Sequence, residues 1–157
     1  SSLKKLYLDC TFKEVNTLEG AILPHGLKEL YIFNNNIWNC LYSKKGIILP
    51  STLEKLYLGG TFSERLINNK WVMEDFLEIS YPEERSDYGK NILPYSLKIL
   101  EIRSNNFNHP LLDFDRRSIL PKGLKKLVLP SNYNYHLIDI EGKSILPKGL
   151  KELIFLE

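Results

Sequence analysis

Residues able to do acid–base or metal chemistry are few and scattered in this sequence. Asp113 and Asp115 alternate in a polar segment and resemble a carboxylate pair, but two arginines follow directly. Two acids beside two bases in a loop are typical of solvated or locally paired charges. No phosphate-binding loop or nucleophile motif occurs. The three histidines share no spacing typical of metal ligands: His25, His109 and His136. The sequence therefore predicts no catalytic residue, no metal site, no cofactor and no enzymatic activity.

Tyrosine is the residue type whose spacing points to binding. Tyr7, Tyr31 and Tyr57 occupy the same position in three successive copies of one short pattern. Exposed tyrosine offers a large contact area and a hydroxyl group, as in recognition surfaces. Tyrosines on neighbouring strands can equally stack and stabilise a sheet. We expect these three residues and Trp71 to bind a partner, and the stacking role stays open beside it.

The pattern that positions the tyrosines is an internal repeat. Leu-Pro pairs at residues 23–24, 49–50, 93–94, 120–121 and 146–147 are each followed by a Leu-x-x-Leu-x-apolar string. Successive strings are 24 to 27 residues apart, except for one interval of 44 residues that holds an insertion of 18. The strings begin at Leu3, Leu27, Leu53, Leu97, Leu124 and Leu150.

Each string predicts one short strand, because its apolar residues alternate over only four or five positions. Strands at a fixed period must lie parallel and share one core with their neighbours. We therefore expect a solenoid with one parallel β-sheet of about six short strands, whose return segments are mostly loops or single helical turns. The inward leucines are expected to be nearly fully buried: Leu6, Leu30, Leu56, Leu100, Leu127 and Leu153.

Two further columns follow each strand. A small polar residue comes five positions after the second leucine, and we expect it to point inward and bond the backbone of the turn. The next large residue is expected to fill the core. The first column is Thr11, Asn35, Thr61, Asn105 and Asn132, and the second is Phe12, Ile37, Phe62, Phe107 and Tyr133.

The outer face of the predicted sheet carries two charged rows. Lys5, Glu29 and Lys55 alternate in sign between neighbouring strands, as do Lys126 and Glu152, which favours cross-strand pairing over a docking row. A mostly basic row lies at the rim, typical of a solvated edge, although it could also attract an acidic partner weakly. It comprises Lys4, Lys28, Glu54, Lys98, Lys125 and Lys151.

The insertion, near residues 67–90, is predicted to contain one short amphipathic helix. Between residues 70 and 79 the apolar side chains fall on one helical face and most charges on the other. The helix is expected to lie on the flank of the solenoid or to provide a family-specific contact. The whole chain, residues 1–157, is expected to form a single solenoid domain, and both ends interrupt a repeat, as in part of a longer chain.

Composition excludes several classes of function. The 157 residues carry a net charge of +2, with 43% hydrophobic and 25% charged residues. This charge is too small to predict a nucleic-acid partner, and no apolar run is long enough for a membrane span. No small-molecule substrate is indicated. Cys10 and Cys40 occupy different places in the repeat, which favours a reducing compartment such as the cytoplasm.

One stretch resembles a known family. Residues 104–111, Ser-Asn-Asn-Phe-Asn-His-Pro-Leu, followed by Ile-Leu-Pro-Lys-Gly-Leu-Lys at 119–125, resemble an FNIP repeat, a short relative of the leucine-rich repeat. The family is abundant in social amoebae and in giant viruses that infect amoebae. The resemblance implies a protein-interaction scaffold in the host cytoplasm or, for a viral protein, in a virus particle. Some relatives carry an F-box and recruit targets to a ubiquitin ligase.

Two functions follow as hypotheses. The first is a non-enzymatic scaffold that binds a protein partner of unknown identity, as the target-recognition part of a ubiquitin-ligase adaptor. The second is a structural component of a particle or assembly in which solenoids pack against one another.

Overall fold

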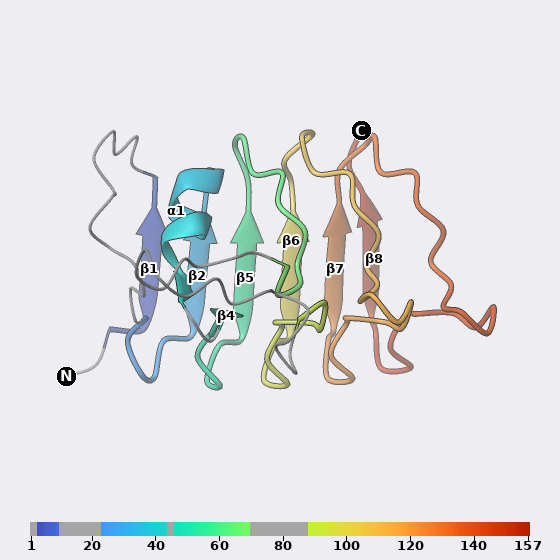
Figure 1. Ribbon diagram of the computed structural model, residues 1–157, viewed down its shortest axis with the longest axis horizontal. Helices are drawn as coiled ribbons and strands as arrows, with labels where there is room; N and C mark the ends of the chain where they lie inside the picture. Colours follow the sequence, from blue (N-terminus) through green and yellow to red (C-terminus); the bar gives the residue numbers. More distant parts are fainter. Residues whose placement is uncertain (1–2, 10–22, 44–45, 70–87) are drawn as a thin grey trace, which may run out of the picture.

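The computed structural model confirms a parallel solenoid (Figure 1). It describes residues 3–9, 23–43, 46–69 and 88–157. One six-stranded sheet has the order β1-β2-β5-β6-β7-β8, and all five neighbouring pairs in it are parallel. The strands are β1 (Lys5–Leu8), β2 (Glu29–Ile32), β5 (Lys55–Leu58), β6 (Ile99–Ile102), β7 (Lys126–Leu129) and β8 (Glu152–Phe155).

Each strand of the sheet after β1 is entered through a tight turn at a Leu-Pro pair. The carbonyl oxygen of Pro94 accepts a hydrogen bond from the Leu97 N–H at 3.1 Å, and the same contact recurs at the other four Leu-Pro pairs. The predicted single helical turn is therefore a four-residue turn that starts at the proline. It fixes where each strand begins, and so keeps neighbouring strands in register.

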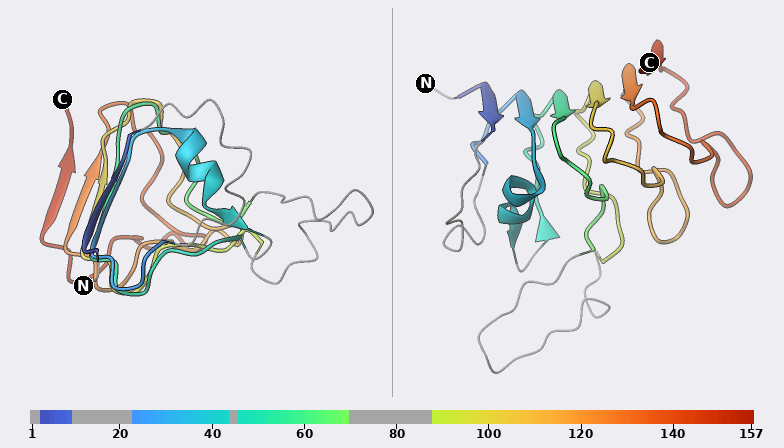
Figure 2. Two further views of the ribbon diagram at one scale, coloured as in Figure 1. Left: turned by 90° about the vertical axis from the view of Figure 1, so that its left-hand side faces the viewer. Right: turned by 90° about the horizontal axis from the view of Figure 1, so that it is seen from above.

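The register matches the sequence pattern residue for residue. Leu30 lies opposite Leu56, and Leu56 lies opposite Leu100, across a chain interval that contains the insertion. The return segments stack on one side of the sheet, as the views along the solenoid axis and along the strands show (Figure 2). The core fills the space between the sheet and these segments.

The leucine prediction is confirmed in the interior and wrong at the ends. Leu30, Leu56, Leu100 and Leu127 are all 0% exposed. Leu6 is only partly buried, and Leu153 is 38% exposed. The two terminal strands have a neighbour on one side only, so the same residue in the same local pattern is buried less.

The second predicted core column is also confirmed where it is described. Ile37, Phe62, Phe107 and Tyr133 are buried, and the Phe107 ring stacks at 6.3 Å from Phe62 and 6.5 Å from Tyr133. Phe12 lies outside the described residues. A further aromatic residue joins this column without having been predicted: Trp38 is 0% exposed and meets Phe62 edge to face at 5.1 Å.

The prediction that the small polar column points inward is wrong for most of the described repeats. Thr61, Asn105 and Asn132 are exposed, not directed inward. The buried polar residue is instead Ser104, whose hydroxyl donates to the Gly60 carbonyl at 2.9 Å. The exposed Asn132 amide still bonds the backbone of the preceding repeat, at the Asn105 carbonyl, 2.6 Å away. Thr11 lies outside the described residues.

Asn35 departs furthest from its prediction, because it begins a helix. Helix α1 spans Asn35–Cys40, and the Asn34 side chain caps it by accepting from the Ile37 N–H at 2.9 Å. Two short antiparallel strands follow, β3 (Tyr42–Ser43) and β4 (Gly46–Ile47). Asn35 nevertheless ties two repeats together, since its amide bonds both the hydroxyl and the N–H of Ser63.

The predicted helix of the insertion, residues 70–79, lies outside the described residues, and so does Trp71. The base of the insertion is described. Ile67 and Asn91 form an antiparallel bridge, and the Asn68 N–H donates to the Lys90 carbonyl at 2.9 Å. These contacts bring the two ends of the insertion together, so the solenoid register continues across it.

We expect Leu100→Ala to lower the free energy of unfolding by about 2–5 kcal/mol, because the side chain is packed between two neighbouring strands. Leu153→Ala is the matched control. It removes the same atoms from a half-open position, and should cost less than about 1 kcal/mol in dilute solution. Chemical denaturation measures both values. Equal losses would contradict burial by stacked neighbours.

Gly60→Ala is expected to destabilise the protein by more than about 1 kcal/mol. Gly60 has a φ of 56°, and a Cβ there would lie 2.3 Å from the Phe33 carbonyl oxygen. Gly142→Ala separates backbone strain from steric overlap. Gly142 also has a positive φ, 76°, but a Cβ there would have no atom within 4 Å. A thermal melt should show a smaller loss for Gly142→Ala. An equal loss would mean that the close approach at Gly60 contributes nothing.

Candidate protein-binding surface

The three predicted tyrosines do form one stack on the outer face of the sheet. The ring centroids of Tyr7 and Tyr31 lie 4.3 Å apart, and the ring planes make an angle of 19°. The ring centroids of Tyr31 and Tyr57 lie 5.4 Å apart, with an interplanar angle of 32°. Strand register produces the stack directly, because Tyr7, Tyr31 and Tyr57 are cross-strand partners. Phe33, which was not predicted, extends it at 5.5 Å from Tyr57.

The members of this stack differ in accessibility. Tyr7 is 55% exposed and Tyr57 is partly exposed, whereas Tyr31 is only 8% exposed between them. Tyr7 is therefore the most accessible ring of the stack, followed by Tyr57. Tyr31 supports its neighbours and offers little surface of its own.

Charged residues of the neighbouring row surround the stack. The Lys5 ammonium lies 5.2 Å from the ring centroids of both Tyr7 and Tyr31, and the Lys55 ammonium lies 5.2 Å from that of Tyr31. Glu29 is the cross-strand neighbour of both lysines, and its carboxylate lies 3.3 Å from the Lys5 ammonium. We call the six residues Lys5, Tyr7, Glu29, Tyr31, Lys55 and Tyr57 the tyrosine cluster. Cation–π contacts and ion pairing together fix its side chains.

One hydrogen bond links the charges to the stack. The Tyr31 hydroxyl donates to a Glu29 carboxylate oxygen at 2.8 Å. This bond, helped by Lys5, lowers the pKa of Glu29 below its ordinary value. Burial, together with the bond to Glu29, raises the pKa of Tyr31. The pKa of Lys5 is raised by its contacts with Tyr7 and Glu29.

Beyond β5 the outer face changes character. Glu101 takes the position of the tyrosines, and its carboxylate accepts from the Arg103 guanidinium at 3.0 Å and lies 3.8 Å from Lys126. Val128 follows and is 0% exposed. The predicted alternation of charge is confirmed again at the end, where Lys126 and Glu152 lie 3.7 Å apart.

The basic rim row has a structural role in the described repeats. The Lys4 ammonium donates to the Gly26 carbonyl in the turn of the next repeat at 3.4 Å, and Lys28 pairs with Glu54 at 2.8 Å. A Cβ on Gly149 would lie 2.8 Å from the Lys125 ammonium. Each of these lysines thus reaches over the following turn, which favours the solvated-edge interpretation over an acidic docking site.

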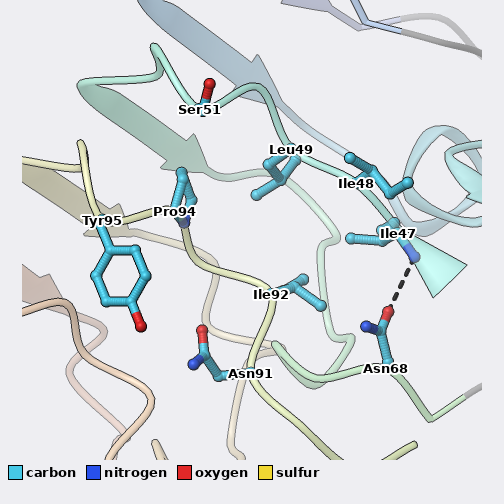
Figure 3. Close-up of a pocket in the computed structure, with 9 residues that line it drawn as sticks. All are labelled: Ile47, Ile48, Leu49, Ser51, Asn68, Asn91, Ile92, Pro94 and Tyr95. Atoms are coloured by element: carbon cyan, nitrogen blue, oxygen red, sulfur yellow. Dashed lines mark hydrogen bonds between the residues drawn. The ribbon is translucent and has the colours of Figure 1, made fainter. Parts of the chain in front are cut away.

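A pocket near the turns that lead into two strands was not predicted. It has a volume of about 300 Å³ and lies between the Leu-Pro segments that precede β5 and β6 (Figure 3). Two exposed apolar side chains stand at it, Tyr95 at 90% and Ile48 at 65% exposure. Tyr95 is the one apolar residue to follow a Leu-Pro pair, which was a signal in the sequence, whereas Ile precedes every Leu-Pro pair and so Ile48 gave none. The lining residues are Ile47, Ile48, Leu49, Ser51, Asn68, Asn91, Ile92, Pro94 and Tyr95.

Three of the side chains first considered for chemistry, His109, Asp113 and Asp115, are engaged in structural contacts. His109 lies 2.6 Å from the Ser63 carbonyl and packs against Phe107. Asp113 accepts from the Arg117 N–H at 3.0 Å, and Asp115 pairs with Lys90. Within residues 3–9, 23–43, 46–69 and 88–157, no three His, Cys, Asp or Glu side chains are grouped as metal ligands.

No helix of the described chain has the length and apolarity to cross a membrane.

The fold and its repeating turns define a solenoid of the leucine-rich-repeat type. Comparison with family models adds that residues 117–157 match the FNIP repeat, which confirms the resemblance over this stretch. No curated protein matches the sequence. One similar solved structure is that of CroV588, a giant-virus protein described as "a novel circular LRR protein structure", with 22% identity and a TM-score of 0.48. The alignment covers 88% of this chain, which spans 18% of that protein's length.

Tyr31→Phe is expected to return the pKa of Glu29 towards its ordinary value, because it removes the hydrogen bond that lowers that pKa most. A depressed carboxyl pKa stabilises the fold above the unfolded pKa, and the benefit is lost as the pH falls through the folded pKa. The variant should therefore lose stability at neutral pH and little at low pH. NMR titration of the Glu29 side chain measures the shift. Tyr57→Phe is the control, and an equal shift there would contradict the assignment.

Proposed function

We propose that this protein is a non-enzymatic scaffold that binds a protein partner through the tyrosine cluster. A repeat fold of the leucine-rich-repeat type is compatible with such a role. The observation that carries the proposal is that Tyr7 is 55% exposed while its ring stacks on Tyr31 and lies 5.2 Å from the Lys5 ammonium. An aromatic side chain already fixed in place loses little conformational entropy when a partner covers it.

Tyr7 is the expected anchor of the interface. Tyr7→Ala should weaken partner binding by about 1–3 kcal/mol, as for an aromatic hot spot, and Tyr57→Ala should weaken it less because Tyr57 is more covered. Tyr95→Ala is the matched control, since Tyr95 is 90% exposed on a different edge. Affinity capture from native extract with each variant, followed by titration of the captured protein, measures the effect.

The outcomes separate binding from structure. If Tyr7→Ala leaves capture intact but lowers the melting temperature, then the stack is structural only. If Tyr95→Ala abolishes capture instead, then the binding surface is the pocket edge. The original expectation that Trp71 joins the site stays a prediction, and Trp71→Ala in the same titration tests it.

A narrower proposal concerns the partner and the setting. We infer from the FNIP resemblance that the scaffold is the target-recognition part of a ubiquitin-ligase adaptor. Its expected location is the host cytoplasm or, for a viral protein, the virus particle. The placement of Cys10 and Cys40 at unrelated repeat positions supports a reducing compartment. Co-capture of ubiquitin-ligase subunits with the full-length protein tests the adaptor role, and their absence from the captured complex would count against it.

The alternative function, a structural component built by packing of solenoids, stays a hypothesis. Sedimentation of the full-length protein tests it, and a species that is monomeric at all concentrations would count against it.

A further inference from the structure

The pocket beside Tyr95 lies in the middle of the sheet order, between the segments that lead into β5 and β6 (Figure 3). Two large side chains that line it are open to solvent: Ile48 is 65% exposed and Tyr95 is 90% exposed. Single exposed apolar residues are common on protein surfaces, but two that line one hollow favour an interaction site.

Ile48 departs from the other members of its repeat column. The residue directly before each Leu-Pro pair is isoleucine, and in the later repeats it belongs to the core. Ile92, Ile119 and Ile145 are 8%, 1% and 4% exposed at that position. The exposure of Ile48 is therefore specific to its own repeat and does not follow from the general pattern.

A shift of one residue explains this exposure. Ile47 is 4% exposed and takes the place in the core. It pairs with Tyr42 between β3 and β4, and its N–H donates to the Asn68 side-chain oxygen at 2.9 Å. Consecutive side chains of an extended segment point to opposite sides. Because Ile47 points inward, Ile48 points outward beside the hollow.

Asn91 brings hydrogen-bonding groups to the pocket. Its Oδ1 atom accepts from the Leu93 N–H at 2.9 Å, and the Ser118 hydroxyl makes the same bond with the Leu120 N–H one repeat later. An asparagine side chain also carries an NH2 group with two donors, which a serine lacks. The exposed Asn91 can therefore donate to a carbonyl oxygen of a ligand while its Oδ1 atom holds the turn.

The turns beside the pocket are basic. Residues 93–98 and 120–125 contain lysines and no acidic residue, and the lysines are exposed. The Lys98 ammonium lies over the following turn, 3.5 Å from the position of a Cβ on Gly123, next to Lys122. The acidic residue of the preceding turn, Glu54, is paired with Lys28 at 2.8 Å. A ligand in the pocket therefore meets positive charge on the side of β6 and β7.

The shape of the pocket favours an attached side chain over a free small molecule. A pocket that holds a small molecule encloses most of its surface, and its volume is usually larger. Here the volume is about 300 Å³, and two of the lining side chains are mostly open to solvent. A side chain that belongs to a partner protein needs no such enclosure, because the residues next to it cover Ile48 and Tyr95.

We propose that the pocket binds an acidic segment of a partner protein, with one large apolar side chain in the hollow and carboxylates beside Lys98 and Lys122. A carbonyl oxygen of the segment accepts from the Asn91 amide. The site is a second binding surface of the scaffold, separate from the tyrosine cluster, and does not require that the tyrosine cluster bind a partner.

Selection of short random peptides displayed on phage, with the whole 157-residue chain as the target, tests the site and the partner chemistry together. The enriched peptides should share one large apolar residue with aspartate or glutamate beside it. A parallel selection on the Ile48→Asp variant should not enrich them. Because Ile48 is 65% exposed, this substitution leaves the core intact, which circular dichroism verifies.

Fluorescence anisotropy with the most enriched peptide measures the dissociation constant. Ile48→Asp should raise it at least about tenfold, because a charge then stands in the apolar contact. Lys122→Glu should raise it roughly threefold, as for one exposed charge pair. Lys148→Glu is the matched control, since it changes the same turn position one repeat further from the pocket, and it should raise the dissociation constant less.

Three results would overturn the proposal. If no peptide is enriched, or if the enriched peptides bind the Ile48→Asp variant equally well, then the pocket is not the binding site. Enriched peptides without acidic residues, or equal effects of Lys122→Glu and Lys148→Glu, would contradict an acidic partner. Peptides whose binding depends on Tyr7 and not on Ile48 would belong to the tyrosine cluster, which would support the proposed function and remove this second site.

Discussion

The structure depends on the burial of each inward leucine by the repeats on both sides of it. No single repeat contains enough apolar surface to stabilise a four-residue strand, so the stabilising contacts are almost all between repeats. The contrast between Leu127, at 0% exposure, and Leu153, at 38%, isolates this contribution, because the two residues share one local sequence pattern. Strand register is the condition for it, since a slip of one residue would turn every leucine to the outer face.

The same register produces the candidate binding surface. Once Leu30 lies opposite Leu56, Tyr31 must lie opposite Tyr57 with its ring over the neighbouring strand. Stacking of the rings is thus a consequence of core packing, and the exposure of Tyr7 follows from its position at the end of the row. Structural and recognition roles of the tyrosines are compatible, because the buried Tyr31 holds the exposed Tyr7 in place.

The strands and their order could be predicted from the sequence, because a period repeated six times determines both. The aromatic core column was predictable for the same reason. Helix α1 was not, since its capping residue Asn34 and buried Trp38 occur in only one repeat and interrupt the periodic pattern. The orientation of the polar column was also not predictable: the side chain that reaches the core depends on the turn at Gly60, where Ser104 and not Asn105 meets the free carbonyl. The pocket beside Tyr95 depends on how two non-identical turns pack, which no single repeat specifies.

Hydrogen exchange of backbone amides, measured strand by strand in dilute solution, tests most directly whether stacking between repeats is what stabilises the fold. The account predicts that protection is highest in β5 and β6, which have neighbours on both sides, and falls towards β1 and β8. Protection that is uniform along the sheet, or highest in β8, would show that repeats are stable without their neighbours and would contradict it.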